Sequence, residues 1–419
     1  MQIQRFKNSL AENVYKNKYA QGPNDSWDAL ADRIVEDVCG SRWGTTHKLL
    51  SDGDRQQLAE YIKQQKFLPG GRYLYYAGRP AKYYNNCYLL RAEEDTREEW
   101  SNVTWRAMSC LMTGGGIGID YSRLRASGKP LSRTGGLASG PIPLMYAVNE
   151  IGRNVMQGGS RRSAIYASLN WQHEDIPLFL KAKNWHDQVL VPGATHWDAK
   201  QVNFNHNAPL DMTNISVNYD DASISNGFVL DPRVLQSNPV FLENCRQAMM
   251  TGEPGFSFNF GDKQNETLRN ACTEVTSEDD SDVCNLGSIN IGNIRSLEEF
   301  KDVVNLASKF LVCGTLRAEL PYEKVYKVRE KNRRLGLGLM GIHEWLLQRG
   351  QAYEVTLELH KWLAVYRDES ERAANEHADR LYISRPVAYR AIAPTGSIGI
   401  LAGKLNCQLY VVIRLKQIR

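Results

Sequence analysis

The chain has 419 residues, of which 42% are hydrophobic and 23% are charged, values that are ordinary for a globular protein. Its 51 Lys and Arg against 47 Asp and Glu leave a formal net charge of only +4, which argues against a dedicated nucleic-acid surface. The first residues lack the apolar core of a secretory signal, and no apolar run is long enough to span a bilayer, so a cytoplasmic protein is expected. The eight cysteines are therefore expected as thiols or catalytic groups rather than as a disulfide framework.

Residues 1–66 have the pattern of a polar, helical region. Ser26 precedes an amphipathic run over 27–35, and acidic residues introduce a second run over 52–62. Ser and Asp at such positions are typical of helix starts. The Pro-Gly-Gly sequence at 69–71 then interrupts the helical pattern.

From there to about residue 295, short apolar segments alternate with glycine-rich turns and helix-like stretches. The apolar segments include 117–119, 164–169 and 214–217. This alternation predicts an α/β fold with a mostly buried sheet. Residues 296–380 then have a strongly helical and charged pattern.

The segment 336–341, Gly-Leu-Gly-Leu-Met-Gly, matches the G-x-G-x-x-G pattern of dinucleotide-binding turns. Such a turn requires a strand before it, whereas residues 323–331 are charged and helix-like. We therefore interpret these glycines as positions of close helix packing and not as a cofactor-binding turn.

Asn270, Cys272 and Glu274 form the most informative pattern in the chain. In an extended segment alternate side chains share a face, so an amide, a thiol and a carboxylate would lie in one small volume. An inert buried cysteine is the simpler alternative, and the triplet alone does not exclude it. A Cys–His hydrolase would need a partner histidine that the sequence does not mark, and the chain has neither Cys-x-x-Cys nor His-Glu-x-x-His, so no metal site is predicted.

The wider pattern resembles the catalytic subunit of ribonucleotide reductase, in the part shared by class I and class II enzymes. The matching segments follow in order over roughly residues 65–403: 86–90, 116–128, 157–162, 270–290 and 393–398. The compact size is similar to that of the short reductase chains of marine phages.

The resemblance implies a ten-stranded α/β barrel over residues 67–403 with a central finger loop. A short helical region at 1–66, without a full ATP cone, would precede the barrel. Residues 404–419 depart from the family after Gly403, so the chain is truncated, residues are missing, or the fold closes in an unfamiliar way.

The resemblance also implies the chemistry: reduction of ribonucleoside di- or triphosphates to 2′-deoxyribonucleotides. Cys272 would be the thiyl-radical site, Glu274 the general base on the 3′ hydroxyl, and Asn270 a hydrogen-bond partner of the substrate. Cys87 and Cys284 would supply two reducing equivalents and finish as a disulfide as the 2′ hydroxyl leaves as water. Cys272 is then expected near this pair, at the centre of the barrel.

Two further sets of residues follow from the resemblance. The expected substrate-binding residues are Asn86, Gly116, Pro394, Thr395, Gly396, Ser397 and Ile398. For the Pro394 loop, which is suited to backbone donation to a phosphate, an ordinary Pro-Gly turn is the alternative. The expected contacts of an allosteric nucleotide are Glu94 or Asp95, Arg125 and Arg161, each of which could equally be a solvated surface charge.

The radical source is expected outside this chain. We favour a metal-containing, ferritin-like subunit over adenosylcobalamin, with a dNTP or ATP as effector. We also expect a homodimer that is reduced by a thioredoxin- or glutaredoxin-type protein. It would act in the cytoplasm (that of the host for a phage protein) and would bind neither a membrane nor nucleic acid. Two alternatives stay open: an inactive nucleotide-binding regulatory homologue, and a thiol–disulfide oxidoreductase that uses Cys87 and Cys284 alone.

Overall fold

The computed structural model describes residues 6–41, 48–155, 163–184, 209–225, 227 and 230–403. The chain divides into two compact units: unit 1 contains residues 1–86 and 283–419, and unit 2 contains residues 87–282. Helices and strands alternate in both, which confirms the predicted α/β class. Ten strands lie in the described residues, the same number as in the expected barrel. The match is loose, because two of these strands form a separate short hairpin.

Unit 1 begins with three capped helices, α1 (Ser9–Lys18), α2 (Trp27–Cys39) and α3 (Asp52–Lys63). The side chains of Asn8, Ser26 and Ser51 each accept a hydrogen bond from the backbone N–H three residues later. Such a cap satisfies a donor that the first helical turn leaves unpaired. The helices predicted over 27–35 and 52–62 are thus confirmed.

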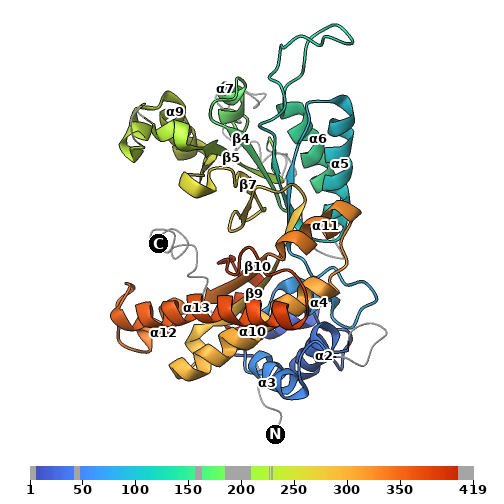
Figure 1. Ribbon diagram of the computed structural model, residues 1–419, viewed down its shortest axis with the longest axis vertical. Coiled ribbons are helices and arrows are strands. Elements are labelled where there is room, and N and C mark those ends of the chain that lie inside the picture. Colours follow the sequence, from blue (N-terminus) through green and yellow to red (C-terminus); the bar gives the residue numbers. More distant parts are fainter. Residues whose placement is uncertain are drawn as a thin grey trace. The chain divides into compact units, whose positions relative to one another are not determined.

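The sheet of unit 1 is built around β9 (Asp282–Asn290). β1 (Phe67–Pro69) pairs with it antiparallel, and β10 (Leu335–Met340) pairs with it parallel. Two long helices, α10 (Leu297–Arg317) and α13 (Leu357–Arg380), pack along each other (Figure 1). The remaining helices of the unit are α4 (Gly71–Tyr76), α11 (Glu323–Asn332), α12 (Ile342–Leu347) and α14 (Gly396–Leu401).

The glycine-rich segment 336–341 lies mostly in strand β10. Gly336 and Gly338 face β9 and the segment after residue 390 rather than a helix, so our interpretation of close helix packing is wrong. A Cβ added to Gly336 would lie 2.9 Å from the Cys284 sulfur, and one added to Gly338 would lie 2.7 Å from the carbonyl oxygen of Ala391. These glycines therefore let β10 approach β9 on one side and the segment after residue 390 on the other. Helix α11 does precede the segment, as predicted, so the geometry is not that of a dinucleotide-binding turn.

Unit 2 contains five parallel strands that pair in chain order. They are β2 (Cys87–Arg91), β3 (Gly116–Asp120), β4 (Ile165–Asn170), β5 (Thr213–Tyr219) and β6 (Gly255–Phe258). The three apolar segments singled out in the sequence fall on β3, β4 and β5. The α-helices in the described residues of the unit are α5 (Arg97–Met112), α6 (Ile142–Asn154), α7 (Ile176–Leu180) and α9 (Pro239–Thr251), and α5 and α6 pack side by side (Figure 1).

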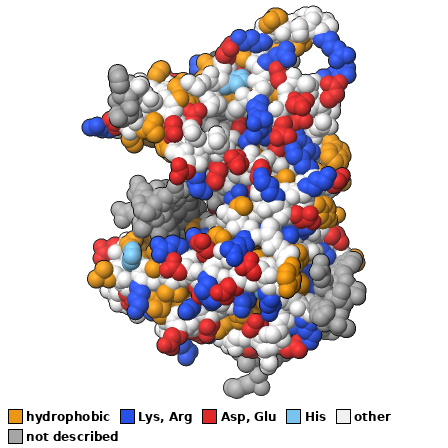
Figure 2. Space-filling model, viewed as in Figure 1, with side chains coloured by type: hydrophobic (Ala, Val, Ile, Leu, Met, Phe, Trp, Pro, Cys, Tyr) orange, Lys and Arg blue, Asp and Glu red, His pale blue; other side chains and the backbone are white. Residues whose placement is uncertain are grey.

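Among the described residues, no helix combines the length and apolar character needed to cross a membrane. Figure 2 shows cationic and anionic side chains interspersed over the visible face, in keeping with the small net charge.

Candidate functional site

The Asn-x-Cys-x-Glu triplet lies in the loop of a short antiparallel hairpin in unit 2, formed by β7 (Leu268–Arg269) and β8 (Thr276–Ser277). We call residues 268–277 the finger hairpin. Its loop begins with a turn in which the Thr273 N–H donates to the carbonyl oxygen of Asn270 (3.0 Å), and Thr273 has a left-handed φ of 64°. The triplet is therefore not extended, and the prediction that its three side chains share one face is wrong.

The three side chains have different surroundings. Asn270 is fully buried, Glu274 is partly buried and Cys272 is exposed. The Asn270 amide oxygen accepts a hydrogen bond from the Val275 N–H (3.0 Å), and its nitrogen donates to the Cys87 sulfur (3.1 Å). Asn270 thus closes the loop and ties it to a second predicted catalytic cysteine.

The glycines of β3 make room for the finger hairpin. A Cβ on Gly118 would lie 1.8 Å from the carbonyl oxygen of Arg269, and one on Gly116 would lie 2.8 Å from the Ala271 Cβ. Gly116 is also the register partner of Cys87 across the β2–β3 pair. The alternation Gly-Ile-Gly-Ile therefore leaves one face of the strand bare where the hairpin lies against it.

Arg269 fixes the base of the finger hairpin to the edge strand β6. Its guanidinium donates to the carbonyl oxygen of Phe258 (3.2 Å), to the side-chain oxygen of Asn259 (2.8 Å) and to the Ser257 hydroxyl. Burial lowers the pKa of this guanidinium, which is nonetheless satisfied by these three acceptors. The hairpin is held from two sides, by β3 and by β6.

Unit 1 carries the other predicted reductant. Cys284 lies fully buried on β9, and its thiol donates to the carbonyl oxygen of Asn285 (3.4 Å). The Asn86 N–H donates to the Cys284 carbonyl oxygen (3.3 Å), and Cys87 follows Asn86 directly in the chain. The Asn86 side-chain oxygen is buried and accepts no hydrogen bond from the described residues, so it has capacity for a ligand. All seven cysteines in the described residues are thiols.

The predicted phosphate loop leads into α14 through Thr395, whose φ of 52° is left-handed. Pro394 and Gly396 are exposed, Ser397 is partly buried, and Thr395 and Ile398 are buried. Nothing lies within 4 Å of a Cβ placed on Gly396, so the loop leaves open space above its backbone.

Two of the predicted effector residues line one cavity of about 460 Å³ in unit 2. Arg125 and Asp95 form an ion pair there, and Lys129 pairs with Glu174 (2.7 Å). Glu94 is exposed and does not line this cavity, while Arg161 lies outside the described residues.

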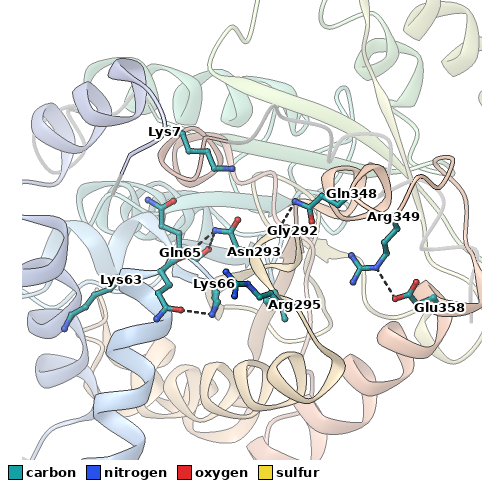
Figure 3. Close-up of a pocket in the computed structure, with 12 residues that line it drawn as sticks. Lys7, Lys63, Gln65, Lys66, Gly292, Asn293, Arg295, Gln348, Arg349 and Glu358 are labelled. Carbon is teal, nitrogen blue, oxygen red and sulfur yellow. Dashed lines mark hydrogen bonds and ion pairs between the residues drawn. The ribbon is translucent and has the colours of Figure 1, made fainter. Parts of the chain in front are cut away.

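A second cavity, of about 1010 Å³, lies in unit 1 and was not anticipated from the sequence (Figure 3). It gathers basic side chains from segments far apart in the chain: Lys7, Lys63, Lys66, Arg295 and Arg349. Most of these cations already have carboxylate partners, such as Glu358 for Arg349 (3.0 Å) and Asp32 for Lys63 (2.8 Å). Their charge is thus largely compensated, and the cavity does not by itself indicate a ligand.

Comparison with known proteins places these features in a family. The family model for the ribonucleotide reductase barrel domain matches residues 85–360. A protein of Mycobacterium phage D29, named provisionally as an adenosylcobalamin-dependent ribonucleoside-triphosphate reductase, is 24% identical over 94% of this chain and 72% of its own length.

Cellular relatives share comparable identity over less of their length. The vitamin B12-dependent ribonucleoside-diphosphate reductase of Thermoplasma acidophilum is 26% identical over 82% of this chain and 48% of its own. The ribonucleoside-diphosphate reductase subunit alpha of Bacillus subtilis is 26% identical over 84% and 56%. The chain thus spans about half the length of these cellular proteins. Since the family model covers well over half of the chain, the chain belongs to the ribonucleotide reductase family of oxidoreductases.

Proposed function

We propose that this chain reduces ribonucleotides to 2′-deoxyribonucleotides by a thiyl-radical mechanism. The observation that carries the proposal is the hydrogen bond from Asn270 to Cys87, because it links the exposed Cys272 loop to a buried thiol of the predicted reducing pair. An exposed thiol is accessible to a substrate and to a radical source, whereas a structural cysteine is ordinarily buried.

In the proposed reaction the Cys272 thiyl radical removes the 3′ hydrogen of the ribose, and Glu274 accepts the proton of the 3′ hydroxyl. The 2′ hydroxyl then leaves as water while Cys87 and Cys284 give up two hydrogens and become a disulfide. Finally Glu274 returns the proton to the 3′ oxygen and Cys272 returns the hydrogen to C3′, which regenerates the Cys272 thiyl radical. Asn86, with its unfilled acceptor, and the open loop at 394–398 are the proposed contacts of the substrate sugar and phosphates.

For the radical source we propose adenosylcobalamin. The sequence alone had favoured a metal-containing subunit, but the phage and Thermoplasma relatives are named for adenosylcobalamin or vitamin B12. The exposed position of Cys272 fits a radical delivered from outside the chain, and when bound this cofactor would supply it. A thioredoxin- or glutaredoxin-type protein would then return the reducing pair to thiols.

Turnover of the purified chain tests this function. With adenosylcobalamin, dithiothreitol and a ribonucleoside tri- or diphosphate, chromatography should detect the matching deoxyribonucleotide. A parallel reaction with a ferritin-like metal subunit separates the two radical sources. If neither produces a deoxyribonucleotide while nucleotides still bind, the chain is the inactive homologue considered above.

We further propose that the cavity lined by Asp95 and Arg125 takes the allosteric nucleotide. Arg125 and Lys129 are paired with Asp95 and Glu174 in this cavity, and the phosphates of a nucleotide would replace these carboxylates as their partners. The released Asp95 carboxylate can accept a hydrogen bond from a sugar hydroxyl. A dNTP or ATP is the proposed ligand.

A homodimer is proposed on the exposed face of α5. Trp105, Met108 and Met112 recur at helical spacing and are 55%, 39% and 62% exposed, and Tyr146 is exposed on the neighbouring α6. A stripe of large apolar side chains on a paired-helix surface is typical of a protein interface, and a second copy of the chain would cover it.

Replacing Trp105 with glutamate is expected to convert the dimer to a monomer, because a charge would have to be buried at the centre of the interface. Light scattering coupled to size-exclusion chromatography measures the change. Leu178→Glu, at an equally exposed leucine on α7, is the matched control and should leave the mass unchanged. A wild-type chain that is monomeric at all concentrations would contradict the proposal.

A further inference from the structure

The cavity of about 460 Å³ in unit 2, which we call the nucleotide cavity, is lined mainly by two segments, residues 124–129 and 172–174. One contact between these segments is the ion pair of Lys129 with Glu174 (2.7 Å). Both side chains of this pair are exposed, so the pair contributes little to stability, and the phosphates of a bound nucleotide would replace it. Two further contacts would then have to hold the segments together.

The first of these contacts is made by the ring of His173. The Asp175 N–H donates to the His173 Nδ1 (3.0 Å), so Nδ1 is an acceptor and the hydrogen of the ring lies on Nε2. Nε2 lies 2.7 Å from the carbonyl oxygen of Leu124 and donates to it. The residue directly before Arg125 is thereby held in place.

The second contact is made by Asp175, whose side chain does not serve its own helix. Asp175 occupies the N-cap position of α7, but its side chain accepts no hydrogen bond from that helix. The carboxylate instead accepts a hydrogen bond from the Ser127 N–H (2.9 Å). Asp175 is only 5% exposed, and a buried carboxylate is costly unless it is hydrogen-bonded. The contact with Ser127 is therefore a specific use of a buried charge.

Ser127 lies at the neck of a hairpin formed by residues 128–140, which backbone hydrogen bonds between its two arms close. The other end of this hairpin returns to the same carboxylate. Gly140 has a left-handed φ of 75°, and a Cβ placed on it would lie 2.2 Å from the Asp175 oxygen that Ser127 binds. Both ends of the hairpin thus pack against one buried oxygen atom.

The cations of the nucleotide cavity are connected to this hairpin. The Arg125 guanidinium donates to the carbonyl oxygen of Pro130 (3.2 Å) while it pairs with Asp95. Arg125 and Lys129 lie two residues before and two residues after Ser127. Because the two cations flank Ser127 so closely, a contact that fixes the Ser127 N–H also restricts the positions of both.

We propose that Asp175 is a positioning residue for nucleotide binding, a role that rests on the function proposed for this cavity. Its carboxylate anchors the neck of the hairpin and keeps Arg125 and Lys129 in fixed positions when the pair of Lys129 with Glu174 opens. The role depends on the acceptor oxygen and not on the charge, since a negative charge would by itself repel the phosphates.

Two substitutions at residue 175 separate the acceptor from the charge. Asp175→Asn keeps an oxygen that can accept from the Ser127 N–H. Titration calorimetry, with whichever of ATP and the four dNTPs binds the wild-type chain most tightly, should therefore give an affinity at least equal to that of wild type. Asp175→Ala removes the acceptor and should weaken binding by about tenfold, as expected for the loss of one hydrogen bond to a charged group.

Asp231→Ala is the matched control for these variants. Asp231 is an aspartate that caps another short helix of unit 2, over residues 232–237, and it does not line the nucleotide cavity. This variant should bind the nucleotide as the wild-type chain does.

Gly140→Ala reaches the same anchor from the other end of the hairpin, with Asp175 intact. The added methyl group would displace the carboxylate oxygen from Ser127, so this variant should also lose affinity. Hydrogen exchange is a readout that needs no ligand. The amides of residues 127–138 should exchange faster in Asp175→Ala than in Asp175→Asn, whereas the amides of α6 should exchange at the same rate in both.

Equal affinities of Asp175→Asn and Asp175→Ala, whether both reduced or both as in wild type, would overturn the proposal. So would exchange at the wild-type rate in the hairpin of Asp175→Ala. Failure of the function proposed for the cavity gives a different result, in which the wild-type chain binds no nucleotide while the exchange difference between the two variants persists. That result would overturn the nucleotide part of the proposal and keep Asp175 as the anchor of the hairpin.

Discussion

Cys272→Ser is expected to abolish deoxyribonucleotide formation completely. Serine keeps the size and hydrogen-bonding capacity of the side chain, but its O–H bond is too strong to yield a radical that the reaction could use and regenerate. Because Cys272 is exposed, the free energy of unfolding should change by no more than about 0.5 kcal/mol. Product formation with adenosylcobalamin and dithiothreitol, together with thermal unfolding, measures both effects.

Cys245→Ser is the matched control, since Cys245 is a partly exposed thiol on α9 outside the finger hairpin. It should leave turnover unchanged. If the chain forms no deoxyribonucleotide, and its thiol–disulfide exchange persists in Cys272→Ser but is lost in Cys87→Ser, the chain is instead a thiol–disulfide oxidoreductase that uses only the reducing pair.

Gly118→Ala is expected to lower turnover by on the order of 100-fold and to destabilise the chain by about 1–3 kcal/mol. The added Cβ would lie 1.8 Å from the carbonyl oxygen of Arg269, so the base of the finger hairpin must move away from β3. Overpacking of this kind costs about 1–3 kcal/mol, and a displacement of about 1 Å at a catalytic group costs about 100-fold in rate. Steady-state kinetics and denaturant unfolding measure the two effects.

Two other glycine substitutions serve as comparisons for Gly118→Ala. In Gly116→Ala the added Cβ would lie 2.8 Å from the Ala271 Cβ and 3.2 Å from the carbonyl oxygen of Ala164, a milder clash that should have a smaller effect of the same sign. Gly53→Ala, in α3 with nothing within 4 Å of the new methyl group, should stabilise the chain by up to about 1 kcal/mol. If all three variants behave alike, close approach of the finger hairpin to β3 is not the cause.

Sequence patterns of a few neighbouring residues were sufficient to predict the helices and strands that such patterns mark. Ser26 caps α2 as its position predicted, and the apolar runs at 117–119 and 164–169 became buried parallel strands. The family resemblance identified the finger loop, and the structure brings Asn270 and Cys87 into contact. These features depend on short-range patterns or on motifs that keep their order along the chain.

The features that could not be predicted depend on contacts between distant segments. The triplet was expected to be extended because its side chains alternate, but Thr273 adopts a left-handed conformation that alternation does not reveal. The glycines at 336 and 338 looked like helix contacts, yet their partners are β9 and the segment after residue 390. Cys313 and His377 have no common motif, and only the packing of α10 against α13 brings them within 3.3 Å of each other.

The hydrogen bond between Asn270 and Cys87 has a consequence for the proposed catalytic cycle. The same amide group closes the loop that carries Cys272, through its bond to the Val275 N–H. In the proposed mechanism Cys87 is oxidised at the end of each turnover; its sulfur would then be a poorer and displaced acceptor, and the amide would lose its bond to Cys87. The loop would then be held less firmly until Cys87 is reduced again. In the enzyme with oxidised Cys87, Cys272 would therefore be misaligned, and no new radical would form on it until Cys87 and Cys284 have been reduced.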